Sequence, residues 1–359
     1  MNNNDFSHRP LRFKPNRVRR TYCGGMLLDK WQGKPDCKDG YSPEEWMAST
    51  VEAYNKGMPE VANEGLSIEC TSGMTLKKII ETDPEGILGK DHLKKFGNAT
   101  GMLVKALDSM ERLNIQVHPD KDLAKKLFNS DFGKIEAWYI HDVRNPADAA
   151  VYAGFKDGVT AAEWKNLFNK QDKAGMLDCL NRLPAKPGDM FFIGGGLPHA
   201  IGAGCLLMEI QEPTDITIRM ERITSMGYKL VDDMIHNGIG FDRMFDCFHY
   251  ENAENNPDIR KQGVVLHSDQ NYQLTSLISY NDTYAFGLQK INITGKCRLG
   301  SIGRISLLVV LEGEGCVETS YGKLEAKQAD SFLIPVGCGD AILSTDSNMQ
   351  ILNCMPPCL

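Results

Sequence analysis

The sequence lacks the features that mark several classes of protein. It has no apolar run that approaches ~20 residues, so it predicts no transmembrane helix. The segment from Met1 to Arg20 is polar and basic without an apolar centre, unlike a secretory signal. The 11 cysteines are odd in number and include no Cys-x-x-Cys pair. We therefore expect no disulfide framework, no membrane partner and a cytoplasmic location.

The overall charge limits the partners further. The formal net charge is −7 over 359 residues, which argues against a protein that binds nucleic acid. An anionic small-molecule substrate remains compatible with it, because local charges around a site decide such binding. Hydrophobic residues make up 42% and charged residues 24%, the balance of a globular protein with one large or two ordinary domains. The sequence is compatible with a monomer or a homodimer.

Several arginines lie close together near the N-terminus. Their clustering suggests an acidic partner, but a partly ordered, solvated arm is the simpler interpretation, and we expect the arm. The arginines are Arg9, Arg12, Arg17, Arg19 and Arg20.

An internal repeat points to a duplicated structural unit. Ala185 to Ile193 aligns without a gap with Ala326 to Ile334, at an offset of 141 residues. Identical residues continue at this offset: Gly196 and Gly337, Ala200 and Ala341, Ile201 and Ile342. Each copy has the pattern of a short strand, a Gly-rich turn and a second strand. Such a repeat predicts two copies of an antiparallel sandwich or barrel.

Helical signals are few. Thr160 followed by Glu163 is a capping-box pattern, and Trp164 comes next at helical spacing. A second short helix is indicated around Met176, ending before Pro184. The stretch from Ser42 to Tyr54 has a helical pattern, although a strand is an equal alternative there.

Three short segments carry residues that suit one metal ion. In a strand, residues two apart project from the same face, so Gln116 and His118 should project together. The same holds for Lys134 and Glu136. A Gly-rich run leads to His199. Each residue alone is more often structural, but together they form a nitrogen and oxygen set suited to Zn²⁺ or another divalent first-row ion.

The same segments resemble the type I mannose-6-phosphate isomerases, in their short bacterial-like form. The matching motifs are Gln-Val-His-Pro (116–119), Lys-Ile-Glu-Ala-Trp-Tyr (134–139) and Pro-His-Ala-Ile-Gly-Ala-Gly (198–204). Weaker similarity covers nearly the whole chain. The resemblance implies a mainly β fold of two cupin (jelly-roll) domains with a small helical insertion. It also implies one Zn²⁺ per chain, held by Gln116, His118, Glu136 and His199.

The resemblance assigns further roles around the metal. Arg219 matches the active-site arginine of the family, and Lys134 is a candidate for proton transfer or for a substrate contact. Glu209 is a candidate acid–base group, with a carboxylate that orients a metal ligand as the equal alternative. Asp215 is expected to be structural and to position Arg219.

A second set of residues is assigned to the substrate. Lys105 matches a lysine near the substrate phosphate, and Lys121 is a weaker candidate. Asn114 stands where many members of the family have a serine that contacts the phosphate. Glu212 adds a negative charge near the expected cleft. These two departures leave the metal set intact and put the identity of the sugar in question.

The expected function is therefore a zinc-dependent aldose–ketose isomerase that interconverts mannose 6-phosphate and fructose 6-phosphate through a cis-enediol. The alternatives are an isomerase of another sugar or sugar phosphate, a non-catalytic metal–sugar sensor and an iron-dependent oxygenase. We expect a catalytic cupin at residues 10–240, with the helical insertion near 158–184. A connection at 241–261 and a second cupin without metal at 262–359 would follow. In that second copy Asp340 stands in place of His199.

Overall fold

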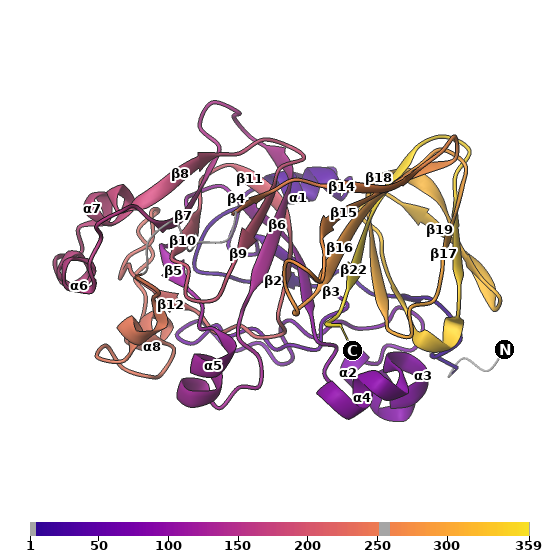
Figure 1. Ribbon diagram of the computed structural model, residues 1–359, viewed down its shortest axis with the longest axis horizontal. Helices are drawn as coiled ribbons and strands as arrows, with labels where there is room; N and C mark the ends of the chain where they lie inside the picture. The colour runs from indigo at the N-terminus through magenta and orange to yellow at the C-terminus, as the bar shows by residue number, and fades with distance from the viewer. Residues whose placement is uncertain (1–4, 251–258, 359) are drawn as a thin grey trace.

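Antiparallel strands dominate the computed structural model, which describes residues 5–250 and 259–358 (Figure 1). Two β-sandwiches lie next to each other, and most of the helices lie at their margins. The prediction of a mainly β fold with two cupin units and few helices is confirmed. None of the helices in the described ranges combines the length and the apolar character that a bilayer crossing needs.

The first sandwich consists of two sheets. The larger sheet has the strand order β13-β9-β6-β11-β4-β3-β2. The bounds of its strands are β2 Arg17–Val18, β3 Glu44–Met47, β4 Leu103–Ser109, β6 Glu136–Val143, β9 Met190–Ile193, β11 Cys205–Gln211 and β13 Arg260–Lys261. The smaller sheet has the order β12-β5-β10-β7-β8. Its strands are β5 Gln116–Val117, β7 Ala150–Phe155, β8 Leu180–Pro184, β10 His199–Ile201 and β12 Ile218–Arg219.

Strand β11 shows that the two faces of the larger sheet lie in different environments, one inside the first sandwich and one against the second. Because side chains alternate along a strand, Leu207 and Glu209 point into the first sandwich. Leu206, Met208 and Ile210 point the other way, into an apolar cluster shared with the second sandwich. All seven residues of β11 are buried. A charged residue at an inward position of such a strand must therefore be paired or used.

The second sandwich is built around one long strand. Strand β18 (Ser306–Thr319) pairs with β19 (Gly322–Lys327), β20 (Ser331–Ile334), β21 (Ala341–Ser344) and β22 (Met349–Met355). The remaining strands are β14 Val264–Ser268, β15 Tyr272–Ile278, β16 Gly287–Ile293 and β17 Lys296–Leu299. Its interior is apolar, with Phe332, Leu308 and Ile351 fully buried.

The N-terminus belongs to this second sandwich. Strand β1 (Leu11–Arg12) pairs antiparallel with β20, with Leu11 opposite Leu333. Strand β13, in the expected connection, pairs with β9 of the first sandwich. The pairing of β1 with β20 thus crosses the expected limits between the two cupins, and those limits remain a prediction.

The arginines of the N-terminal segment are fastened to the folded protein. Each one forms an ion pair with a carboxylate at 2.8 to 3.2 Å: Arg9 with Glu69, Arg12 with Asp330, Arg17 with Asp29, Arg19 with Glu64, and Arg20 with Asp215. The expectation of a solvated arm is therefore wrong. The partners lie 12 to 318 residues away in the sequence, so no local pattern could have indicated them.

The helices are short, as their bounds show: α1 Met26–Trp31, α2 Leu76–Thr82, α3 Pro84–Leu88, α4 Lys90–Phe96, α5 Lys121–Phe128, α6 Ala161–Lys170, α7 Lys173–Asp178 and α8 Asp232–His236, with 3₁₀ turns η1 Met244–Cys247 and η3 Val336–Cys338. The predicted capping of α6 is confirmed, because the Thr160 side chain accepts a hydrogen bond from Glu163 N at 3.2 Å. Helix α7 ends at Asp178, earlier than expected, and the chain continues as strand β8. Helices α1 to α5 and α8 were not anticipated.

Three further expectations from the sequence can be compared with the structure. Between Ser42 and Tyr54 the regular element is the strand β3, so the strand alternative holds there. In the internal repeat, β9 corresponds to β20 from end to end, and β10 corresponds to β21. Most of the expected connection at 241–261 is described, but residues 251–258 lie outside the described part of the chain.

The pairing of β1 with β20 predicts that Leu11 contributes strongly to stability. Leu11 is fully buried against the second sandwich. Leu11→Ala should lower the free energy of unfolding by about 3 kcal/mol, because it removes buried methyl groups and leaves a cavity. Urea unfolding measures this loss.

The matched control is Leu266→Ala on β14, where the side chain is 55% exposed. It should change the free energy of unfolding by less than about 0.5 kcal/mol. Equal effects of the two substitutions would contradict the placement of β1.

Candidate metal centre and active site

A cavity between the two sheets of the first sandwich collects most of the residues singled out in the sequence. Lys105 of β4, Glu136 of β6 and Glu209 of β11 enter it from the larger sheet. Gln116 of β5 and Arg219 of β12 enter it from the smaller sheet. The remaining polar lining residues are Arg20, Thr21, Tyr22, Glu44, Asn114, Lys134, Asp215, Thr217 and Thr224.

Three buried ligand groups meet beside this cavity. One ligand atom each of His118, Glu136 and His199 lies within 4.8 Å of the other two. Their exposed fractions are 1%, 1% and 0%. Nδ1 of His118 faces the carbonyl of Ile216 at 2.9 Å, and Nδ1 of His199 faces the carbonyl of Leu197 at 2.9 Å. A carbonyl can only accept, so both Nδ1 atoms carry the proton and both Nε2 atoms are left with a lone pair.

Two distances within this group are close to the ligand separation around a tetrahedral divalent ion. His118 Nε2 lies 3.4 Å from Glu136 Oε2, and His199 Nε2 lies 3.2 Å from Glu136 Oε1. Ligand atoms bound at ~2.0–2.1 Å to a tetrahedral Zn²⁺ are separated by about 3.3 Å. His199 Nε2 is buried and has no hydrogen-bond partner. The lone pairs, the spacing and the unpartnered nitrogen together fit a zinc site.

Gln116 lies next to this group in the smaller sheet. It is directly opposite His199 on β10 and opposite Arg219 on β12. Directly opposite residues of an antiparallel pair have Cβ atoms roughly 5 Å apart. The expectation that Gln116, His118, Glu136 and His199 occupy one region therefore agrees with the structure, while their role as ligands remains a prediction.

The glycines before His199 bring the two ligand segments together. Gly196 N donates to the His118 carbonyl at 2.8 Å, and Gly196 has a φ of 80°. A Cβ on Gly195 would lie 2.6 Å from the Cα of Asp120. A larger residue at Gly195 would push the His199 segment away from Asp120, which directly follows the Gln-Val-His-Pro segment, and a side chain at Gly196 would collide with the ring of His249.

Lys134 presents a positive charge to the ligand group. Its Nζ lies 2.7 Å from His118 Nε2 and 2.7 Å from Glu136 Oε2, and 3.8 Å from Glu209 Oε1. The predicted common face of Lys134 and Glu136 is therefore present. Because Lys134 donates to the lone pairs that would bind a metal ion, the ammonium group and a metal ion compete for these atoms.

Glu209 has the environment of a proton-holding group. It is 3% exposed, and Lys105 Nζ lies 3.7 Å from its carboxylate. Burial raises the pKa of Glu209 against the opposing charge of Lys105, and the neighbouring charge of Glu136 raises it further. The two carboxyl groups share a water-poor space, so one of them favours its protonated form.

Arg219 is a partly buried cation in the cavity wall. Its Nη1 donates to the carbonyl of Met234 at 2.6 Å, and within the described ranges it forms no ion pair. Burial lowers the pKa of Arg219 to about 10, although the nearby charge of Asp215 opposes this. Four of the five guanidinium N–H groups have no partner among the described residues, which leaves them for an acceptor in the cavity.

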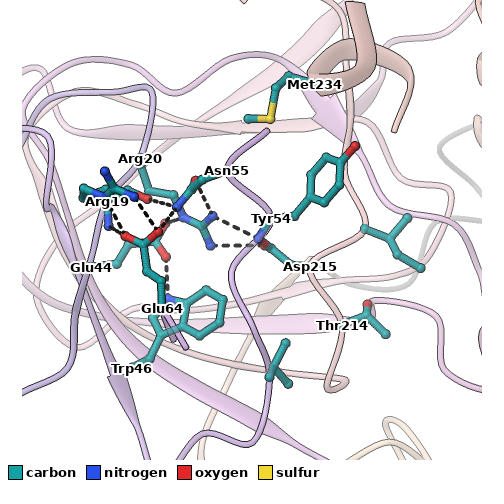
Figure 2. Close-up of polar contacts among 12 residues, drawn as sticks. Arg19, Arg20, Glu44, Trp46, Tyr54, Asn55, Glu64, Thr214, Asp215 and Met234 are labelled. Atoms are coloured by element: carbon teal, nitrogen blue, oxygen red, sulfur yellow. Dashed lines mark hydrogen bonds and ion pairs between the residues drawn. The ribbon is translucent and has the colours of Figure 1, made fainter. Parts of the chain in front are cut away.

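Asp215 does not pair with Arg219, contrary to expectation. Its carboxylate forms two hydrogen bonds with Arg20, at 3.0 and 3.1 Å, and accepts a third from Tyr54 N at 2.7 Å (Figure 2). Arg20 Nε also lies 3.0 Å from Glu44. Sequence reasoning missed Arg20 and Glu44 as parts of the site. Glu44 carried a signal, because on the short strand β3 it shares a face with the uncharged Trp46.

Two other predicted residues lie away from the cavity. Lys121 begins helix α5 on the surface, where its Nζ lies 5.6 Å from the centre of the Tyr284 ring. Glu212 is buried and accepts a hydrogen bond from Ile135 N at 3.1 Å, so it holds the turn before Glu136 and does not face the cavity. Asn114 does line the cavity, and its Oδ1 is buried without a partner.

The Asp215–Arg20 pair predicts a specific pH dependence of stability. Burial opposes ionisation, but Arg20 and Lys105 lower the pKa of Asp215 to about 2. The stabilisation is therefore complete above the unfolded pKa of ~3.9 and is lost as the pH falls toward 2. Asp215→Asn should cost about 2 kcal/mol at pH 6, and this difference should shrink at pH 2.5. Urea unfolding at both pH values measures it, and a difference that is the same at both would contradict the assignment.

Comparisons with known proteins agree with this site. The family model described as "Phosphomannose isomerase type I, catalytic domain" matches residues 37–150, which include Gln116, His118 and Glu136. The mannose-6-phosphate isomerase ManA of Bacillus subtilis (strain 168) is 28% identical over 335 residues, covering 92% of this chain and 94% of that protein.

Solved structures share the fold. The mannose 6-phosphate isomerase from Bacillus subtilis superimposes with a TM-score of 0.74 at 23% identity, covering 96% of this chain and 99% of that one. A zinc-bound mannose 6-phosphate isomerase gives a TM-score of 0.72 at 15% identity, covering 97% and 100%. The chain is therefore similar over nearly all of its length to mannose-6-phosphate isomerases, and residues 37–150 match the catalytic-domain model of the type I phosphomannose isomerases.

Proposed function

We propose that this protein interconverts mannose 6-phosphate and fructose 6-phosphate at the cavity of the first sandwich, with one Zn²⁺ per chain. Gln116, His118, Glu136 and His199 would hold the ion. The observation that carries the proposal is the buried group of His118, Glu136 and His199 at the wall of a cavity that also holds Lys105, Glu209 and Arg219. The full-length similarity to mannose-6-phosphate isomerases supports the choice of substrate.

The reaction moves one proton between C1 and C2 of the sugar through a cis-enediol. When bound, the metal ion would supply Lewis acidity that stabilises the charge on the enediol oxygens. Positioned acid–base groups commonly contribute about 10²–10⁴-fold to such a step. The groups of this chain that are placed for proton exchange are Lys134 and Glu209, whose charged atoms lie 3.8 Å apart.

These two groups have complementary properties in our proposal. Glu209 holds its proton because burial favours the neutral carboxyl. Lys134 lies in hydrogen-bond contact with Glu136 and His118, so it sits at the edge of the space where C1 and C2 would bind next to the metal ligands. Arg219 would donate hydrogen bonds to a substrate oxygen on the opposite wall, formed by β12.

The anionic end of the substrate would be bound by two cations that line the cavity. Lys105 is 3% exposed, and Arg219 is partly buried. A buried cation interacts with an anion more strongly than an exposed one, because water screens the charges less. Contacts with these two side chains would let a protein of net negative charge bind a sugar phosphate.

A different sugar is the second candidate substrate, and one observation favours it. The Asn114 Oδ1 atom is buried at the cavity and unpartnered, and its Nδ2 lies 3.5 Å from the carbonyl of Glu221. An oxygen acceptor at this position suits a sugar hydroxyl better than a phosphate oxygen. The metal-dependent isomerisation would be the same on either substrate.

The deciding experiment is isomerase turnover on mannose 6-phosphate, before and after chelation and after restoration with Zn²⁺. Chelator-sensitive production of fructose 6-phosphate supports the proposal. A metal-loaded protein without this turnover would contradict it, and a panel of other aldoses would then test the second candidate.

Removal of a ligand should remove the metal ion. His199→Ala should lower the bound zinc, measured by atomic emission after dialysis, from about one ion per chain to near zero, and turnover should fall with it. The matched control is His249→Ala, because His249 is about half exposed and pairs with Asp120 at 3.0 Å. Equal zinc contents in the two variants would contradict the role of His199.

Removal of Lys105 should weaken substrate binding more than turnover at saturation. A lost charged hydrogen bond of ~1.5 kcal/mol corresponds to a rise in KM of about 10-fold for Lys105→Met. Steady-state kinetics measure both constants. Lys126→Met on the exposed face of α5 is the control and should keep the KM of the unaltered protein. An unchanged KM in Lys105→Met would exclude this lysine from the anion site.

A further inference from the structure

Two consecutive arginines near the N-terminus reach different parts of the molecule. Arg19 forms ion-pair contacts with Glu64 at 2.9 Å and donates to the carbonyl of Pro59, so it fastens the loop that contains Tyr54 and Asn55. Arg20 turns inward and lines the cavity of the first sandwich with 6% of its surface exposed. Figure 2 shows the two guanidinium groups on opposite sides of Asn55 and Glu64.

Arg20 pairs with two carboxylates at the cavity. Nη1 and Nη2 bind both oxygens of Asp215, and Nε lies 3.0 Å from Glu44 Oε1. The same Glu44 oxygen accepts from the Tyr22 hydroxyl at 2.7 Å, and its other oxygen accepts from Trp46 Nε1 at 2.7 Å. All four carboxylate oxygens therefore have donors that do not come from Lys105 or Arg219.

Lys105 and Arg219 line the same cavity, and they are close enough to these carboxylates for the negative charges to affect their pKa values. Burial lowers the pKa of both cations, and the charges of Asp215 and Glu44 raise it. Together with Glu209, these charges leave the pKa of Lys105 raised, whereas burial dominates for Arg219 and leaves its pKa lowered. Even so, no ion pair joins either cation to Asp215 or Glu44. In the described ranges, the only carboxylate within ion-pair distance of Lys105 is Glu209, at 3.7 Å, and no carboxylate lies within ion-pair distance of Arg219.

Competition explains this arrangement. A buried carboxylate without a partner is costly, so it takes the nearest available cation. Arg20 offers Asp215 a bidentate contact, which is the strongest geometry for a carboxylate. If Arg20 were absent, Lys105 and Arg219 would be the nearest cations to two uncompensated negative charges. The two cations would then pair with the carboxylates of the protein itself.

We propose that Arg20 is a positioning residue that occupies Asp215 and Glu44 and thereby keeps Lys105 and Arg219 available for an anionic group of the substrate. The proposal rests on the function proposed above only in that this anion is the phosphate of the sugar. The bound anion itself can be probed with inorganic phosphate, without any turnover.

Calorimetric titration of the metal-loaded protein with inorganic phosphate tests the proposal. In Arg20→Met the freed carboxylates should pair with Lys105 and Arg219, and phosphate affinity should fall by about 10-fold or more, the loss expected for a charged contact. In the double variant Arg20→Met/Asp215→Asn, Asp215 no longer competes, and Glu44 keeps its hydrogen bonds from Tyr22 and Trp46. Affinity should then return to within about threefold of the unaltered protein, because the two sites are coupled.

Two further variants keep the test decisive if Arg20→Met folds poorly. Asp215→Asn alone keeps every cation and removes a competitor, so it should bind phosphate at least as tightly as the unaltered protein. Arg19→Met is the matched control, because it breaks a similar ion pair outside the cavity. It should lower thermal stability without changing phosphate affinity or KM. In steady-state kinetics, Arg20→Met should raise KM more than it lowers kcat.

Three outcomes would overturn the proposal. These are phosphate affinity that is unchanged in Arg20→Met, affinity that is lost in Asp215→Asn, and an unaltered protein that binds no phosphate. Turnover of the unaltered protein on mannose 6-phosphate is measured separately and decides the proposed function. A failure of one is therefore distinguishable from a failure of the other.

Discussion

The structure depends on one constraint: the interior of the first sandwich holds charged groups that are cut off from water. Lys105, Glu136, Glu209 and Arg20 are each less than a tenth exposed. An unpaired charge in such a place costs several kcal/mol. The network of contacts among these groups is therefore a condition for the fold as well as the basis of its chemistry. A change to one member alters the partners available to the others.

Strands that are buried on both faces make this interior possible. Strand β11 is buried on both sides, with Glu209 facing the cavity and Met208 facing the cluster shared with the second sandwich. The second sandwich thus covers the outer face of the sheet that carries Lys105, Glu136 and Glu209. Without this cover the apolar residues of β4, β6 and β11 would face water, and the sheet that positions half of the site would lose its support.

The sequence predicted the site where its residues are close in short motifs, and it failed where they are not. Gln116 and His118, or Lys134 and Glu136, are two residues apart, so the strand period places them together. The partner of Arg20 is 195 residues away, and no local pattern indicates such a pairing. Lys121 follows the metal segment directly, yet Asp120 caps a helix there and directs the lysine to the surface. Asn114 was found only through its position in a known motif.

The pairing of β1 with β20 also has a consequence for the order in which the protein forms. Leu11 leaves the ribosome 322 residues before its partner Leu333. At ~5–20 residues per second, β1 waits roughly 15–60 s for its place in the sheet. During that time an apolar strand and the basic segment around it are exposed in the nascent chain. The interval is a window for chaperone binding or for pairing with a neighbouring chain on the same messenger.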